Sequence, residues 1–164
     1  MQKNILVIEN NEKHLNDAKA EARVRKDMVL VDFATTYETA EKLINSKDYD
    51  RIISDIFFPF DDKKQEGSPD GWNDLASHKC FLLLKEFGIT THGAQNVTEA
   101  ASLWIDGFEM HPTGVIVVEM ALELKIPIVL CMDIHRRILS AEPVKKFAEH
   151  KGVEVTDSCE AEYR

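Results

Sequence analysis

Asp55 is the residue whose type and position point most clearly to chemistry. It lies in the segment Arg-Ile-Ile-Ser-Asp-Ile-Phe-Phe-Pro at residues 51–59, where an apolar run typical of a buried strand carries one carboxylate four residues before Pro59. In parallel α/β sheets, ligands gather in the crevice outside the carboxyl ends of the strands. Asp55 is therefore predicted to face such a crevice as part of a functional centre; the alternative is that it only caps the loop after the strand.

A second acidic residue follows the first apolar run of the chain. Ile5 to Ile8 is predicted to be a short buried strand, and Glu9 and Asn10 come directly after it. If the two strands run parallel in one sheet, these polar residues lie at the same edge as Asp55. The alternative is an ordinary polar exit from the strand, with Asn10 or Asn11 capping the next helix.

Other polar groups give weaker signals. Five histidines and Cys80 suggest a metal, but their spacing fits no zinc pattern: His78, His92, His111, His135 and His150. Four aspartates of one polar loop do not follow the order of an EF-hand, so a solvated loop is favoured: Asp61, Asp62, Asp70 and Asp74. Gly114 begins a predicted helix, whose free backbone N–H groups are a candidate anion site.

The elements that position these residues alternate between strand and helix. In the first half, apolar runs at 5–8, 28–33 and 51–57 are separated by two segments of helical periodicity, the first capped by Asn10 or Asn11 and the second by Thr35 or Thr36. In the second half, helices over 115–124 and 141–150 alternate with strands over 128–132 and 153–156. This βαβ pattern predicts a parallel sheet with right-handed crossovers.

Residues 60–112 interrupt that alternation. They open with a polar loop longer than most connections inside a domain, and two helices are predicted to follow over 75–87 and 98–110. Trp72 and Trp104 are interpreted as part of the core of this insertion. The length of 164 residues fits a single domain, 1–164, with 60–112 as a helical insertion within it.

With these elements in place, the chain resembles the receiver domain of bacterial two-component response regulators, which has a flavodoxin-like fold. The matching segments are Ile-Leu-Val-Ile-Glu-Asn-Asn at 5–11, Tyr-Asp-Arg-Ile-Ile-Ser-Asp-Ile-Phe-Phe-Pro at 49–59 and Ile-Pro-Ile-Val-Leu at 126–130. The resemblance implies a three-layer α/β fold with a parallel sheet in the order 2-1-3-4-5, here without the last helix. It also implies that Asp55 is the phosphoacceptor and that Glu9, Asn10 and Asp55 hold Mg²⁺.

Several supporting groups of a receiver are altered in this chain. The acidic pair of the family is Glu9 and Asn10 here, so one carboxylate is left. The hydroxyl expected after strand four falls at Met132 or Cys131, and the last strand lacks the lysine that would contact a phosphoryl group. Arg136 or Arg137 is a geometric substitute for that cation. We therefore expect a degenerate phosphoacceptor pocket, with the insertion placed over it.

The charge and the cysteines of the chain limit the kinds of partner and the cell compartment that are expected. The net charge of −9, from 20 Lys and Arg against 29 Asp and Glu, argues against nonspecific nucleic-acid binding. Three widely spaced cysteines, Cys80, Cys131 and Cys159, predict neither a disulfide framework nor a zinc knuckle and favour the cytoplasm. The most apolar stretch, 115–132, is interrupted by charges, so no membrane segment is expected. A sheet face without its last helix predicts a protein partner or a homodimer.

Three functional hypotheses follow. The first is a divergent receiver-like signalling or protein-interaction module that is not an enzyme. The second is a working phosphoacceptor of a two-component phosphorelay, with a histidine kinase as phosphodonor. The third is a small ligand-binding protein or enzyme of another flavodoxin-like lineage, although the sequence holds no GxGxxG, Walker or nucleophile-elbow motif.

Overall fold

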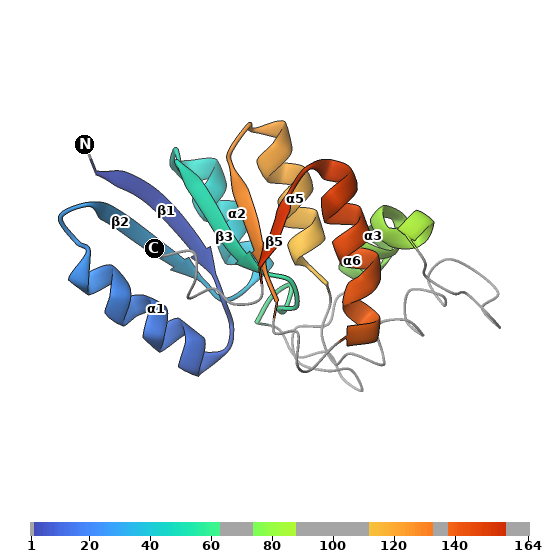
Figure 1. Cartoon of the computed structure of the whole chain (residues 1–164), viewed down its shortest axis with the longest axis horizontal. Helices are drawn as coiled ribbons and strands as arrows, with labels where there is room; N and C mark the ends of the chain where they lie inside the picture. The colour runs from blue at the N-terminus through green and yellow to red at the C-terminus, as the bar shows by residue number, and fades with distance from the viewer. Residues whose placement is uncertain (1, 63–73, 88–111, 133–137, 157–164) are drawn as a thin grey trace.

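The protein is built around a five-stranded parallel sheet in the order β2-β1-β3-β4-β5, as seen in a computed structural model of the chain (Figure 1). The structure describes residues 2–62, 74–87, 112–132 and 138–156. The strands are β1 Lys3–Ile8, β2 Val29–Ala34, β3 Arg51–Asp55, β4 Ile128–Cys131 and β5 Glu154–Thr156. The predicted α/β fold and strand order are therefore confirmed.

Helices connect the strands and cover both faces of the sheet. Their bounds are α1 Glu12–Val24, α2 Tyr37–Ser46, α3 Asp74–Leu84, α5 Gly114–Glu123 and α6 Ile138–Lys151, with a short 3-10 turn η1 at Lys85–Phe87. The predicted helix over 75–87 corresponds to α3 and η1. The predicted helix over 98–110 and the residues after β5 lie outside the described residues.

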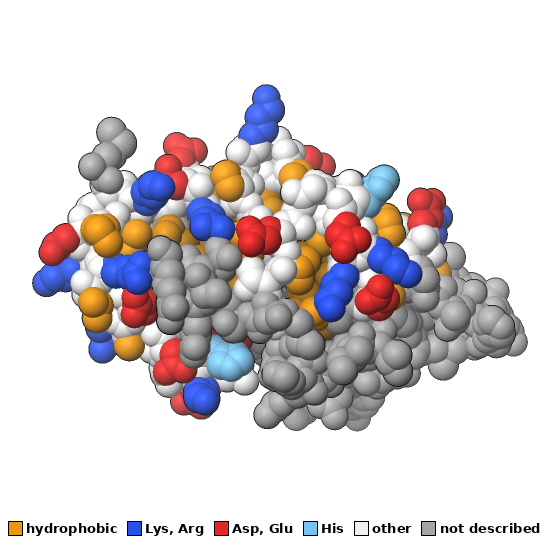
Figure 2. Space-filling model, viewed as in Figure 1, with side chains coloured by type: hydrophobic (Ala, Val, Ile, Leu, Met, Phe, Trp, Pro, Cys, Tyr) orange, Lys and Arg blue, Asp and Glu red, His pale blue; other side chains and the backbone are white. Residues whose placement is uncertain are grey.

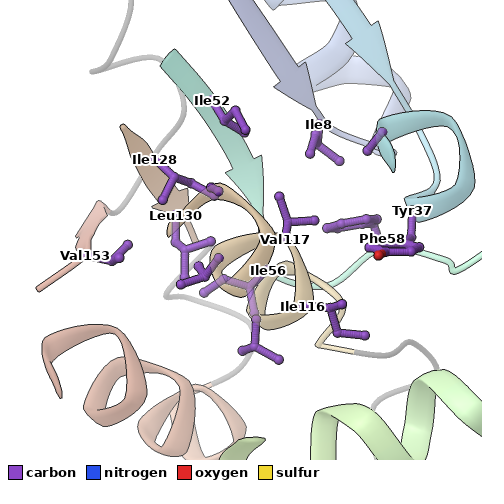
Figure 3. Close-up of a cluster of buried hydrophobic side chains, with 14 of the residues drawn as sticks. Ile8, Tyr37, Ile52, Ile56, Phe58, Ile116, Val117, Ile128, Leu130 and Val153 are labelled. Atoms are coloured by element: carbon purple, nitrogen blue, oxygen red, sulfur yellow. The ribbon is translucent and has the colours of Figure 1, made fainter. Parts of the chain in front are cut away.

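The core is divided by the sheet into two unequal clusters. The larger one joins strand residues such as Ile52 and Leu130 to α2, α5 and α6, and Figure 3 shows Val117 and Ile116 of α5 among these side chains. The smaller one joins Val7, Ile53 and Cys131 to Ala18 of α1. The alternation of strand residues between the two clusters follows from the two-residue period of a strand.

Helix α3 belongs to the layer on the larger core. Its residues contact α5 and α6, and η1 also contacts α6. Ala76, Cys80 and Leu84 are buried in the large cluster, whereas Leu75 and Leu82 are exposed on its surface. The described helix of the 60–112 insertion is thus an ordinary part of the helix layer.

Two helices end in the same hydrogen-bonded turn, and each turn leads into the next strand. At the end of α5, the N–H of Ile126 donates to the carbonyl of Ala121 at 2.8 Å; at the end of α6, the N–H of Val153 donates to that of Ala148 at 2.8 Å. The residue before each donor has a positive φ: 58° at Lys125 and 69° at Gly152. Such Schellman turns normally place glycine at that position.

Candidate functional site

The carboxyl edge of the sheet brings together residues that end, or directly follow, four of the strands. The register pairs Asp55 with Cys131 and Cys131 with Thr156. On the other side, β1 pairs with β3 up to Ile8 and Ser54, so one further step places Glu9 opposite Asp55. Glu9, Asp55, Cys131 and Thr156 therefore share one row, as the sequence predicted for the first two.

Glu9 is a buried carboxylate with protein partners on both oxygens. It is 2% exposed, and its backbone N–H extends the β1–β2 ladder to the Ala34 carbonyl at 2.9 Å. Its Oε1 accepts the N–H of Asn11 at 2.8 Å, and its Oε2 lies 3.5 Å from Nδ1 of His14. Burial raises the pKa of Glu9 above its usual range, and the contacts from Asn11 and His14 offset only part of that rise.

The residues after Glu9 start helix α1. The side chain of Asn11 is the N-cap and accepts the N–H groups of Lys13 at 3.0 Å and His14 at 3.3 Å. Asn11, one of the two residues predicted for this role, is therefore the cap, and Asn10 is left as a half-buried residue of the turn. The cap also fixes His14 in the first turn, within reach of Glu9.

Asp55 is the last residue of β3 and is half-buried. Its Oδ1 accepts the backbone N–H of the next residue, Ile56, at 2.7 Å, and its own carbonyl accepts the Ser54 hydroxyl at 2.7 Å. The carboxylate thus lies at the carboxyl end of β3, as predicted, and one of its oxygens stabilises the start of the following loop. The capping interpretation of Asp55 is therefore confirmed, and the functional one stays a prediction.

The position beside Asp55 on β4 is apolar. Cys131 is 2% exposed and Met132 is 3% exposed. These are the two residues at the position where the receiver resemblance expects a hydroxyl, and neither carries one. The backbone N–H of Met132 instead donates to the Thr156 carbonyl at 2.9 Å. Thr156, the last residue of β5, carries a hydroxyl and shares this row, whereas the receiver resemblance leads one to expect a lysine from this strand and not a hydroxyl.

The segment after Asp55, residues 56–60, is held by two helix N-termini. The N–H of Gly114, the first residue of α5, donates to the Ile56 carbonyl at 2.9 Å, and the N–H groups of Tyr37 and Glu38 in α2 donate to the carbonyls of Pro59 and Phe60 at 3.1 and 3.0 Å. The predicted anion site at Gly114 is therefore wrong, because this N–H is already bonded to a carbonyl.

Gly114 also allows the close approach of α5 to β3. A Cβ at this position would lie 2.7 Å from the Asp55 carbonyl oxygen and 2.9 Å from Cα of Ile56. Both neighbours are backbone atoms, which cannot move aside without shifting the strand end. Glycine is thus needed here for space.

Those of the remaining candidate residues that the structure describes do not form a metal site. Within the described ranges, no three His, Cys, Asp or Glu side chains stand close enough together to hold a metal ion. Cys80 is fully buried, which raises the pKa of its thiol, and its Sγ lies 3.6 Å from the Pro112 carbonyl. Some candidates lie outside the described residues: Asp70, Trp72, His92, Trp104, His111, His135, Arg136, Arg137 and Cys159.

The described surface carries charged and apolar side chains side by side (Figure 2). On the face drawn in Figure 2, acidic and basic side chains alternate over the described surface, with apolar side chains between them. Among the described helices, none is long and apolar enough to cross a membrane.

Comparisons with known proteins do not place the chain in a family. No family model matches it, and no curated protein matches it. One solved structure is similar over 92% of both chains, at 19% identity and a TM-score of 0.32: a fusion described as the yeast Spc42 trimeric coiled coil, amino acids 181–211, joined to another structure. That degree of likeness carries no argument about fold or function.

Proposed function

We propose that the protein is a divergent receiver-like module that acts in signalling through protein–protein contacts, with a degenerate phosphoacceptor pocket at the carboxyl edge of its sheet. The strand order and the row formed by Glu9, Asp55 and Cys131 support the receiver-like part of the proposal. The environment of Glu9 supports the degenerate part, and this is the observation on which the proposal chiefly rests.

A working phosphoacceptor needs a divalent cation, because an aspartate cannot approach a phosphate dianion without neutralisation of the charge. Mg²⁺ takes hard, preferably anionic, oxygens in octahedral geometry. Glu9 is poorly suited to supply one, since burial favours its protonated form and its oxygens already face Asn11 and His14. Asn10 is neutral. The pocket would therefore hold Mg²⁺ weakly, through Asp55 and whatever oxygens Glu9 and Asn10 still present.

The charge on a phosphoryl group would also lack a cation from the neighbouring strands, although Thr156 of β5 carries a hydroxyl. Cys131 offers no hydroxyl next to Asp55, and β5, which reads Glu-Val-Thr, offers no lysine. Stabilisation of developing charge by positioned donors is a large contribution to such transfers. We infer that the protein keeps a role in binding other proteins and not in phosphoryl transfer.

Mg²⁺ affinity tests this reasoning directly. Isothermal titration with Mg²⁺ should give little or no heat for the wild-type protein at neutral pH. Asn10→Asp, which restores the second carboxylate, should bind Mg²⁺ more tightly than the wild type, and adding Asp55→Asn to that variant should reverse the gain. Wild-type binding as tight as that of Asn10→Asp would contradict the degenerate pocket.

Exposed apolar side chains support the interaction part of the proposal. Leu75 and Leu82 lie seven residues apart on one side of α3 and are 63% and 44% exposed. Light scattering over a range of protein concentrations separates a homodimer from a monomer that awaits a different partner. If the wild type dimerises, Leu75→Lys with Leu82→Lys should weaken the dimer when α3 forms the interface.

A further inference from the structure

Thr113 uses its hydroxyl in an unusual way for the N-cap residue of a helix. In α1 and α2, the N-cap side chains of Asn11 and Thr36 accept N–H groups of their own helices. Thr113 is the N-cap of α5 but makes no such bond. Its hydroxyl donates instead to the carbonyl of Phe58 at 2.7 Å, and the residue is completely buried. The helix thus forgoes a side-chain cap, and the hydroxyl ties it to the loop after Asp55.

That bond completes a set of contacts along residues 56–60. The carbonyls of Ile56, Phe58, Pro59 and Phe60 all accept hydrogen bonds from donors in α2 or at the start of α5. Phe58 also forms a parallel bridge with Pro112, the residue before Thr113. At the far end, the rings of Phe60 and Tyr37 stack with centroids 4.9 Å apart.

The near end of the segment begins at the carboxylate of Asp55. Its Oδ1 accepts the N–H of Ile56, and the carbonyl of Ile56 accepts the N–H of Gly114. Ile56 and Phe58 are fully buried, and a close-packed interior transmits a displacement instead of absorbing it. Ile56, Phe58 and Tyr37 all belong to the same core cluster (Figure 3).

We propose that Thr113 is a positioning residue that makes residues 56–60 a rigid connection between Asp55 and the first turns of α5 and α2. A change of charge at Asp55 alters the hydrogen bond to Ile56, and the tied segment carries this change to Tyr37 and Glu38 at the start of α2. The proposal goes beyond the proposed function and does not rest on it, because the charge at Asp55 is changed by substitution in the test below. The connection itself belongs to the fold.

Amide hydrogen exchange followed by NMR tests the connection, with Asp55→Asn as the change of charge. Asparagine keeps an oxygen acceptor for Ile56 but loses the charge that strengthens this bond. We expect faster exchange at Ile56 and Gly114 and, through the segment, at Tyr37 and Glu38, by about fivefold or more. In Thr113→Val, which lacks the hydroxyl, the same substitution should change exchange only at Ile56 and Gly114. Thr113→Ser, which keeps the hydroxyl, should behave like wild type.

Two results would overturn the proposal. One is an equal effect of Asp55→Asn on Tyr37 and Glu38 in the wild-type and Thr113→Val backgrounds; the other is no effect on those two amides in either. If Thr113→Val does not fold, Phe60→Leu weakens the same connection at the Tyr37 ring, while the backbone hydrogen bonds of Tyr37 and Glu38 remain. It should reduce the effect at α2 and leave that at Gly114, and an undiminished effect at α2 would contradict the proposal. The exchange data do not depend on Mg²⁺, so they fail or succeed separately from the degenerate pocket.

Discussion

Glu9 is a carboxylate whose surroundings limit what the carboxyl edge of the sheet can bind. Its side chain is removed from water, and its raised pKa means that the folded protein favours the protonated form more than the unfolded chain does. Glu9 therefore contributes to stability below the ordinary glutamate pKa, and this contribution is lost as the pH rises through the folded-state pKa. Above the folded-state pKa, ionisation of the buried Glu9 side chain reduces the stability of the folded protein.

Substitution by the neutral isostere tests that sign. Glu9→Gln should be more stable than wild type at pH 7, because glutamine needs no deprotonation and can still accept the Asn11 N–H. The difference should shrink as the pH is lowered towards 4. Urea unfolding at several pH values measures it, with exposed Glu12→Gln as the control. The stability of Glu9→Gln minus that of wild type is the quantity to compare. If this difference is smaller at pH 7 than at pH 4, the raised pKa of Glu9 is contradicted.

Gly114 gives a second prediction at the scale of one side chain. Alanine normally favours a helix over glycine, but here its Cβ would meet backbone atoms of Asp55 and Ile56 within 3 Å. Overpacking of this kind costs about 1–3 kcal/mol, so Gly114→Ala should lower the unfolding free energy by about that amount. Chemical denaturation measures it, and Glu123→Ala, at the exposed end of the same helix, should change stability by less than about 0.5 kcal/mol.

Residue-level prediction from the sequence succeeded where the signal was local. Glu9 and Asp55 were placed at the sheet edge because each follows an apolar run. The roles of Thr113 and Gly114 were missed because their partners, Phe58, Asp55 and Ile56, lie more than fifty residues away and are reached only through tertiary packing. His14 was missed for a different reason: it meets Glu9 only after the Asn11 cap turns the chain.

At the scale of elements, the turn between α5 and β4 carries a conformational strain that the turn between α6 and β5 avoids. Lys125 takes the left-handed conformation that Gly152 takes at the equivalent position. A side chain with a Cβ costs roughly 1–2 kcal/mol in this conformation. Substitutions at Lys125 and Gly152 should therefore change the unfolding free energy in opposite directions.

Lys125→Gly should raise the unfolding free energy by about 1 kcal/mol, and Gly152→Ala should lower it by about the same amount. The space around Gly152 is open, so the loss there reports the backbone conformation and not a clash. Thermal or urea unfolding measures both variants. Equal effects of the same sign would show that the positive φ values do not control these turns.

Element boundaries show where sequence patterns stop being sufficient. The apolar run of β3 predicts a strand to Phe57, but the strand ends at Asp55 because the carbonyls that follow bond to α5 and α2 and not to β4. Helix α6 begins at Ile138, before the predicted start at residue 141. In both cases the apolar pattern identifies the element but does not set its exact end.

At the scale of the whole molecule, the strand order follows from the alternation of strand and helix together with the resemblance that the sequence suggested. Short parallel strands separated by helices leave few possible arrangements. The role of the insertion did not follow from the sequence, because the apolar residues of α3 gave no indication of their partners. Their contacts place α3 beside α5 and α6.

On the proposed function, the carboxyl edge of the sheet keeps the position of a phosphoacceptor without its chemistry. Intact-protein mass spectrometry after incubation with acetyl phosphate and Mg²⁺ tests it most directly, with a receiver domain that does autophosphorylate in a parallel reaction as the positive control. We predict that wild type and Asp55→Asn both keep their unmodified masses. The addition of one phosphoryl group to wild type, absent from Asp55→Asn, would contradict the claim.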